Sequence, residues 1–100
     1  MPATKTTAED LVRRYADDIA YAAEEQPATT LGAFIAQLGT ASSRLEDAGI
    51  NNAGDLETAA TYLNDATSAS GTDQAALLNR AEQLLKYVTD MVDEYRDMVG

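Results

Sequence analysis

Apolar residues recur at intervals of three and four along most of the chain, and this spacing gathers side chains on one face of an α-helix. The longest series lies toward the C-terminus, where intervals of four and three alternate as in a heptad repeat. Its members are Leu77, Ala81, Leu84, Val88, Met91, Tyr95 and Met98. Flanking apolar residues widen this seam into a stripe typical of a globular core: Leu78, Leu85, Val92 and Val99. Since no segment alternates as a β-strand does, the sequence predicts an all-α fold.

Three shorter stretches show the same spacing and predict three further helices. Their apolar faces are Leu11, Tyr15, Ile19 and Ala22 in the first, Leu31, Phe34, Ile35, Leu38, Ala41 and Leu45 in the second, and Leu56, Ala59, Ala60 and Leu63 in the third. We therefore expect a four-helix bundle with short loops and helices at approximately 7–26, 30–48, 53–68 and 72–99. A chain of 100 residues, 45% of them hydrophobic, suffices for one domain over 1–100, with residues 1–5 disordered.

Capping residues predict where the helices begin and end. Thr6 with Glu9, and Asn52 with Asp55, have the spacing of a capping box, and Thr30 is suited to cap the second helix. The predicted terminators are Pro27, Gly49 and the break over Ser70, Gly71 and Thr72. The fourth helix is then the longest, and at 1.5 Å per residue it would run about 39 Å. Such a helix would protrude beyond the bundle and expose Tyr95, Met98 and Val99 unless the first helix or a second copy covers them.

One short run has a counterpart in a known family. The run from Leu45 to Leu56 resembles the second half of helix-hairpin-helix domains, in which Leu, Ala-Gly-Ile and Asp-Leu recur at these distances around a tight turn. The resemblance implies the geometry of the turn, with Ile50 tucked between the two helices. Those domains contact the DNA backbone through a Gly-x-Gly hairpin, whereas Gly39 stands alone here. The resemblance therefore implies no DNA-binding function for this chain.

The chain is strongly acidic. Seventeen acidic and seven basic residues give a formal charge of −10, which repels nucleic acid phosphates and anionic membrane surfaces. We therefore expect neither direct nucleic acid binding nor membrane binding. The acidity serves solubility or adaptation to high salt, as in a halophile, or else it attracts a cationic partner. The N-terminal residues lack the apolar core of a signal peptide, and no stretch is long enough to span a bilayer, so the expected location is cytoplasmic.

Several kinds of chemistry are excluded by residues that the chain lacks. The absence of histidine and cysteine removes Ser-His and Cys-His nucleophile pairs, thiolate–zinc sites and the Glu-x-x-His pairs of di-iron bundles. No glycine-rich phosphate loop is present. Carboxylates alone could offer oxygen ligands to calcium or magnesium at Asp90, Asp93, Glu94 and Asp97, although such a run is typical of a solvated helix face. We expect no enzyme, no cofactor and no metal.

The segment over residues 26–43 is the first candidate for a functional surface, because it contains no charged residue in this highly charged chain. Small residues line the side of its helix opposite the apolar face: Gly32, Ala36, Gly39 and Ser43. Two glycines inside one helix call for a packing reason, since each costs about 1 kcal/mol relative to alanine. Either this helix is central in its own bundle, with neighbours on both sides, or the small-residue face binds a partner or a second copy.

The flank of the fourth helix is the second candidate. It carries tyrosine and methionine, which are enriched at protein interfaces because they offer large, adaptable contact areas. The predicted partner-binding residues are Tyr87, Met91, Tyr95 and Met98. The competing interpretation is that these side chains form the margin of the chain's own core.

Acidic residues crowd the ends of two helices, where the macrodipole is already negative and each added charge costs about 0.3 to 1 kcal/mol at low salt. They are Asp17, Asp18, Glu24 and Glu25 in the first helix and Asp90, Asp93, Glu94 and Asp97 in the fourth. The function expected from these features is a non-catalytic protein–protein interaction module, either an adaptor or a homodimerising bundle. The alternative is an acidic inhibitor from a phage or mobile element that mimics nucleic acid phosphates and occupies the basic groove of a nucleic-acid-binding machine.

Overall fold

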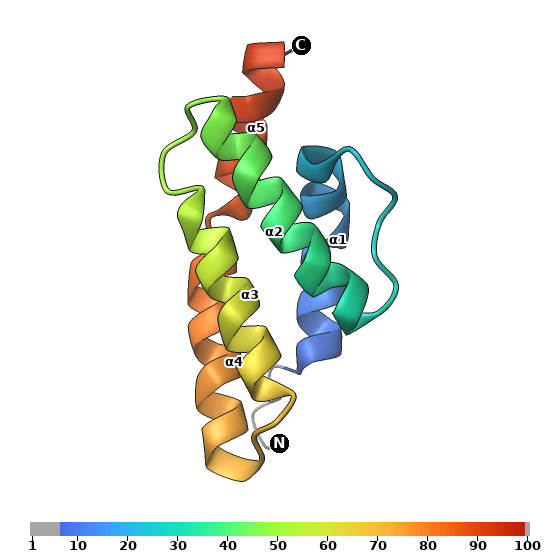
Figure 1. Ribbon diagram of the computed structural model, residues 1–100, viewed down its shortest axis with the longest axis vertical. Coiled ribbons are helices and arrows are strands. Elements are labelled where there is room, and N and C mark those ends of the chain that lie inside the picture. Colours follow the sequence, from blue (N-terminus) through green and yellow to red (C-terminus); the bar gives the residue numbers. More distant parts are fainter. Residues whose placement is uncertain (1–6, 100) are drawn as a thin grey trace, which may run out of the picture.

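A computed structural model describes residues 7–99, and every regular element within that range is a helix. The elements are α1 (Ala8–Ala23), α2 (Leu31–Asp47), α3 (Gly54–Ala66), α4 (Gly71–Leu85) and α5 (Val88–Val99). They form an elongated bundle of 42 × 27 × 23 Å in which α2 crosses diagonally over α1 and α3 (Figure 1). The predicted all-α bundle with short loops is confirmed. The segment predicted to be disordered, 1–5, lies outside the described residues.

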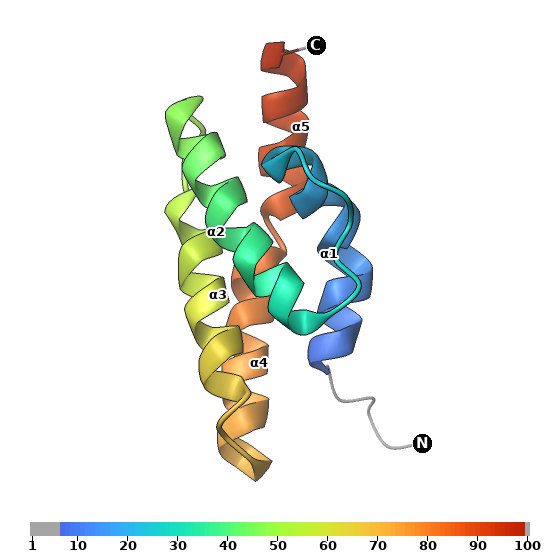
Figure 2. The same cartoon turned by 45° about the vertical axis from the view of Figure 1, so that its right-hand side comes forward.

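The fourth predicted helix, 72–99, is present as two segments with a break at Lys86 and Tyr87. The single 39 Å rod expected from the sequence is therefore wrong, although both segments are helical. The reason lies in their neighbours, because α4 packs along α3 whereas α5 packs along α1 (Figure 2).

The apolar faces predicted from the spacing meet in a single core. Its largest fully buried side chains are Leu11, Ile19, Phe34, Leu38, Leu45, Leu56, Leu63, Leu85, Val88 and Val92. All five helices contribute to this list. Burying one such side chain is worth about 1.5 to 3 kcal/mol, so the core is the main stabilising term. Alanines such as Ala22, Ala41 and Ala59 are also fully buried, and their small size lets the helix axes approach one another.

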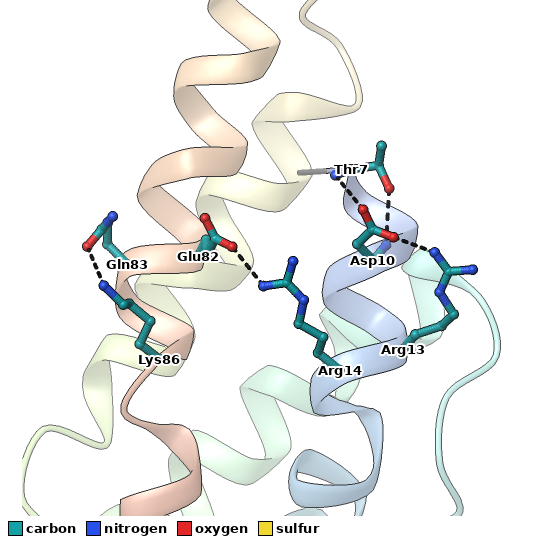
Figure 3. Close-up of polar contacts among 7 residues, drawn as sticks. All are labelled: Thr7, Asp10, Arg13, Arg14, Glu82, Gln83 and Lys86. Carbon is teal, nitrogen blue, oxygen red and sulfur yellow. Dashed lines mark hydrogen bonds and ion pairs between the residues drawn. The ribbon is translucent and has the colours of Figure 1, made fainter. Parts of the chain in front are cut away.

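The start of α1 differs from the predicted one by one residue. Thr7, not Thr6, is the N-cap, and its hydroxyl accepts a hydrogen bond from the Asp10 amide (3.1 Å) while Asp10 accepts one from the Thr7 amide (3.3 Å). Asp10 takes the place of Glu9 in the capping box because it lies three residues after Thr7, and it also pairs with Arg13 one turn later (Figure 3). The Arg13 guanidinium and the Thr7 amide together lower the pKa of Asp10.

Helix α1 also ends earlier than expected. It stops at Ala23 because Glu24 adopts the left-handed conformation (φ 57°), so Pro27 is not what terminates it. Arg14, in the middle of α1, reaches across to Glu82 of α4 (2.8 Å), and this contact raises the pKa of the Arg14 guanidinium (Figure 3). The ion pair is exposed on the arginine side, so its contribution to stability is modest.

The ends of α2 follow the prediction. The Thr30 hydroxyl accepts a hydrogen bond from the Ala33 amide (3.2 Å), and Gly49 is left-handed with φ 83°. Ile50 is buried between α2 and α3, as the resemblance to helix-hairpin-helix turns implied. The connection from α1 to α2 is held along the flank of α2, because Gln37 Nε2 donates to Gln26 O (2.6 Å).

The predicted cap of the third helix is wrong. The N-cap of α3 is Ala53, which makes no side-chain capping bond, and Asn52 is itself left-handed with φ 68°. Asparagine tolerates that conformation because its short polar side chain bonds locally, so Asn52 turns the chain instead of capping the helix. The turn is fixed from the other side by Ser42, whose buried hydroxyl donates to Ala53 O (2.9 Å).

Replacing this hydroxyl should loosen the α2–α3 turn. We expect Ser42→Ala to lower the free energy of unfolding by about 1 kcal/mol, the net value of one hydrogen bond. The exposed neighbour provides a matched control, because Ser43→Ala should change stability by less than about 0.5 kcal/mol. Urea unfolding followed by circular dichroism measures both variants. Equal stabilities would show that the Ser42–Ala53 bond does not hold the turn.

Candidate functional site

The small-residue side of α2 faces away from the bundle. Gly32, Ala36 and Ser43 are exposed and Gly39 is half-buried. Among residues 7–99, no atom of a neighbouring element lies within 4 Å of the position that a Cβ would take at Gly32 or Gly39. The opposite side of the helix, which carries Phe34 and the other core residues, packs on α1 and α3 (Figure 1). Within residues 7–99, α2 therefore has neighbours on one side, and the interpretation that it is enclosed on both sides is wrong.

We call this surface the neutral face and define it by Gly32, Ala36, Gly39 and Ser43. Charge begins only at its C-terminal border, where Arg44 pairs with Glu24 across the end of α1 (2.5 Å). Residues 26–43 carry no charge at all. The neutral face is therefore an uncharged strip along one exposed helix of an otherwise acidic surface.

The four partner-binding residues predicted for the fourth helix, of which Tyr87 lies in the break and the other three in α5, separate into two groups. Met91 and Tyr95 are only 4% and 8% exposed and belong to the core, whereas Tyr87 and Met98 are 58% and 56% exposed. The burial arises because α1 covers this side of α5: the rings of Tyr21 and Tyr95 meet edge to face at 6.2 Å between centroids. A partner could reach Tyr87 and Met98 in this arrangement, but Met91 and Tyr95 are inaccessible to it.

The junction of α1 and α5 also contains polar contacts that the sequence did not predict. The Arg96 guanidinium lies 4.7 Å from the centre of the Tyr21 ring, a cation–π geometry. Thr89 Oγ1 donates to Asp18 Oδ2 at 3.0 Å. Asp18, predicted as part of an acidic surface, is thus partly used in holding α5 against α1.

The acidic helix ends come together at one end of the bundle. Helices α1, α2 and α5 all finish there, because the connection over residues 24–30 runs back along the bundle before α2 begins (Figures 1 and 2). We call this the acidic end and define it by Glu24, Glu25, Glu46, Asp47, Asp93, Glu94 and Asp97. Its local basic residues are Arg44 and Arg96, which pair with Glu24 and Asp93. Asp17 and Asp90 lie farther from this end on α1 and α5.

Glu46 and Asp47 are members of the acidic end that the sequence interpretation missed. They occupy the last turn of α2, so the argument used for the other two helices applies to them equally. No three carboxylates of the described residues are arranged to hold a metal ion. Over the same residues, no helix has the length and apolar character required to cross a membrane.

A hollow of about 480 Å³ lies at the other end of the bundle, where α1, α2 and α4 begin and α3 finishes. Its walls are largely apolar, with Ala8, Leu31, Ala66 and Leu78 among them. Glu9 is the ionisable residue of its lining. Without a second ionisable group, these lining residues provide no acid–base pair for catalysis.

No family model, curated protein or solved structure was found to match this chain.

The acidic end should lower the stability of the fold in a salt-dependent way. We expect Asp97→Asn, in the last turn of α5, to raise the free energy of unfolding by about 0.5 kcal/mol at low salt. Asp73→Asn, in the first turn of α4, should lower it by a similar amount, because a negative charge is favourable there. Urea unfolding at low and at molar sodium chloride measures the stability of the two variants. The stability changes caused by the two substitutions should be smaller at high salt. The same sign for both variants would contradict this account.

Proposed function

We propose that this chain is a non-catalytic protein-interaction module that binds through the neutral face of α2. The occupant is a helix, supplied by another protein or by a second copy of the chain. The observation that carries the proposal is the combination of exposure and absence of charge along Gly32, Ala36, Gly39 and Ser43. The absence of histidine and cysteine from the sequence supports a non-catalytic role.

Electrostatics favour this face over the rest of the surface. A chain with a formal charge of −10 repels a second copy, and it repels most acidic proteins as well. Repulsion is weakest where the surface carries no charge. Removing water from small uncharged residues also costs less than removing it from carboxylates, which must be paired when buried. The neutral face is therefore the part of α2 best suited to close contact.

The two glycines of the neutral face, Gly32 and Gly39, favour the close approach of a partner helix. Each glycine inside a helix costs about 1 kcal/mol relative to alanine. Packing among the described residues does not offset this cost, since none of their atoms outside α2 lies within 4 Å of the Cβ position at Gly32 or Gly39. A partner helix lying across the neutral face could approach closely, because no long side chain separates the two backbones. The gain in van der Waals contact would then offset the cost of the glycines.

Charge placed on the neutral face should abolish binding without unfolding the protein. We expect Ala36→Arg to remove any dimer of the chain, and to reduce at least tenfold the affinity for a captured partner, because it buries an unpaired charge. The measurement is absolute mass by light scattering after size exclusion at physiological and molar salt. If the wild type is monomeric, the same variant is compared with it in partner capture from a lysate.

Ala76→Arg is the matched control, because Ala76 is an exposed alanine on α4 and the change in net charge is the same. It should leave both dimerisation and capture unchanged. Circular dichroism should give the same helix content for both variants. If Ala36→Arg behaves like the wild type in every assay, the neutral face is not the binding surface.

The convergence of acidic residues favours a second candidate function. Under this proposal the acidic end presents its carboxylates in place of nucleic acid phosphates and occupies the basic groove of a nucleic-acid-binding protein. Three helix C-termini point to the same end, so their macrodipoles add to the negative potential of the side chains. Such a role is that of an inhibitor of the kind carried by phages and mobile elements.

Removal of the negative charges along α5 tests this second function. Replacing Asp90, Asp93, Glu94 and Asp97 by their amides should abolish binding to a nucleic-acid-binding protein with a basic groove, because the attraction is electrostatic. Calorimetry at rising sodium chloride should show affinity falling steeply for the wild type. The control replaces four acids elsewhere, Glu9, Glu57, Asp65 and Asp73, and should retain most of the binding. Salt-insensitive binding would instead support the neutral face.

A further inference from the structure

The hollow at the start of α1, α2 and α4 reaches down to residues of the core (Figure 1). The most buried residues of its lining are Leu78 and Ala66, which are only 7% and 2% exposed. Ala8 and Leu31 also line it and are half-buried. Its volume of about 480 Å³ falls within the range of about 300 to 1,000 Å³ that is typical of small-molecule sites. The hollow is therefore large enough to take the apolar group of a small molecule.

One side chain of the lining fixes the wall that α3 and α4 form. Gln74 Nε2 donates to Ala66 O (3.0 Å) and to Ala69 O (3.2 Å), so the first turn of α4 is joined to the end of α3. Gly71 lies between them in the left-handed conformation (φ 59°), which lets the chain reverse direction there. This wall is held by the chain's own hydrogen bonds, so a ligand would not have to order it.

Glu9 places a negative charge at the hollow, and within residues 7–99 its carboxylate has no basic partner. The two basic residues that follow it on α1 are engaged elsewhere, because Arg13 pairs with Asp10 and Arg14 pairs with Glu82. Helix α3 ends at the hollow with no basic residue in its last turn, so the negative end of its macrodipole adds to the same potential. A carboxylate beside apolar walls is suited to an ammonium group attached to an apolar chain.

The beginnings of α1, α2 and α4 oppose this potential, because helix N-termini carry partial positive charge and favour anions. That charge is already compensated within the chain. The first turns of α1 and α4 carry acidic residues, Asp10 and Asp73 among them. The hydroxyls of Thr7 and Thr30 accept hydrogen bonds from first-turn amides of α1 and α2. Because the whole chain also has a formal charge of −10, electrostatics favour a cation over an anion of the same shape.

We propose that the hollow binds a small amphipathic cation, a molecule whose apolar group ends in a protonated amine. The apolar group packs on Leu31 and Leu78, and the ammonium group lies beside Glu9. The driving force is the removal of apolar surface from water, and the carboxylate selects the charge of the ligand. This site lies apart from the neutral face and does not depend on the function proposed for that face.

Three probes with the same apolar chain test the proposal: octylamine, octanol and octanoate. NMR titration of the isotopically labelled full chain, at neutral pH and physiological salt, measures their dissociation constants and identifies the amides that respond. We expect octylamine to bind most tightly and octanoate most weakly, with the changes gathered at Ala8, Leu31, Ala66 and Leu78. Absence of octylamine binding overturns the proposal, as does octanol or octanoate binding as tightly as octylamine.

Glu9→Gln tests the role of the carboxylate. We expect the affinity for octylamine to fall about threefold, the effect of losing an exposed ion pair, while the affinity for octanol stays the same. Glu57→Gln is the matched control, because Glu57 is exposed on α3, lies outside the lining, and gives the same change in net charge. Equal losses in the two variants would show that octylamine responds to the acidity of the whole chain, which overturns the proposal.

Filling the hollow tests where the ligand lies. Ala75 is exposed and lines the hollow, so Ala75→Trp should weaken the binding of octylamine and octanol at least about tenfold. Ala76 is also exposed but does not line the hollow, and Ala76→Trp should leave both affinities unchanged. Circular dichroism should give the same helix content for both variants. An unchanged affinity in Ala75→Trp would place the ligand elsewhere and overturn the proposal.

Lys5 provides the competing source of an ammonium group, because it lies four residues before Glu9 in the sequence. We expect Lys5→Gln to leave the dissociation constant of octylamine unchanged within about twofold. If this substitution makes octylamine bind more tightly by a larger factor, the chain's own lysine occupies the position beside Glu9, and the proposal of an external cation fails.

Discussion

The rest of the structure depends on the burial of one side of α2 against α1 and α3. Phe34, Leu38 and Leu45 are completely enclosed there, and the apolar surfaces of the other two helices are turned inward to meet them. Because a helix presents a single apolar stripe, this burial also decides which side of α2 remains outside. The exposure of the small residues is a direct consequence of how the core is filled.

The same packing aligns charges that are far apart in the sequence. Helix α2 runs in the same sense as α1, since Arg44 near its end pairs with Glu24 at the end of α1. Helix α5 joins them through the Tyr21–Tyr95 contact. Three negative helix ends and their carboxylates are thereby concentrated at one end, and the neutral face runs along the side. The molecule thus separates an uncharged helix surface from a strongly charged one.

Much of the secondary structure could be predicted because its causes are local. The apolar spacing located the helices, and Thr30 and Gly49 act at the ends of α2 as expected. The prediction failed where the sequence offers two adjacent positions for one role. The capping box uses Thr7 and Asp10 and not Thr6 and Glu9, and Asn52 takes the left-handed turn position instead of capping α3. The spacing of residue types is the same for both positions in the first case, so it does not distinguish them.

The sequence by itself determined the all-helical class, the composition of the core, the charge, and the absence of histidine and cysteine chemistry. Only the tertiary structure decided that Met91 and Tyr95 are buried while Tyr87 and Met98 are exposed, that the small-residue side of α2 is open, and that the fourth helix breaks. The physical reason is that spacing fixes which residues share a face of a helix. It does not fix which neighbour covers that face, because that depends on how several helices together minimise the apolar surface left in water.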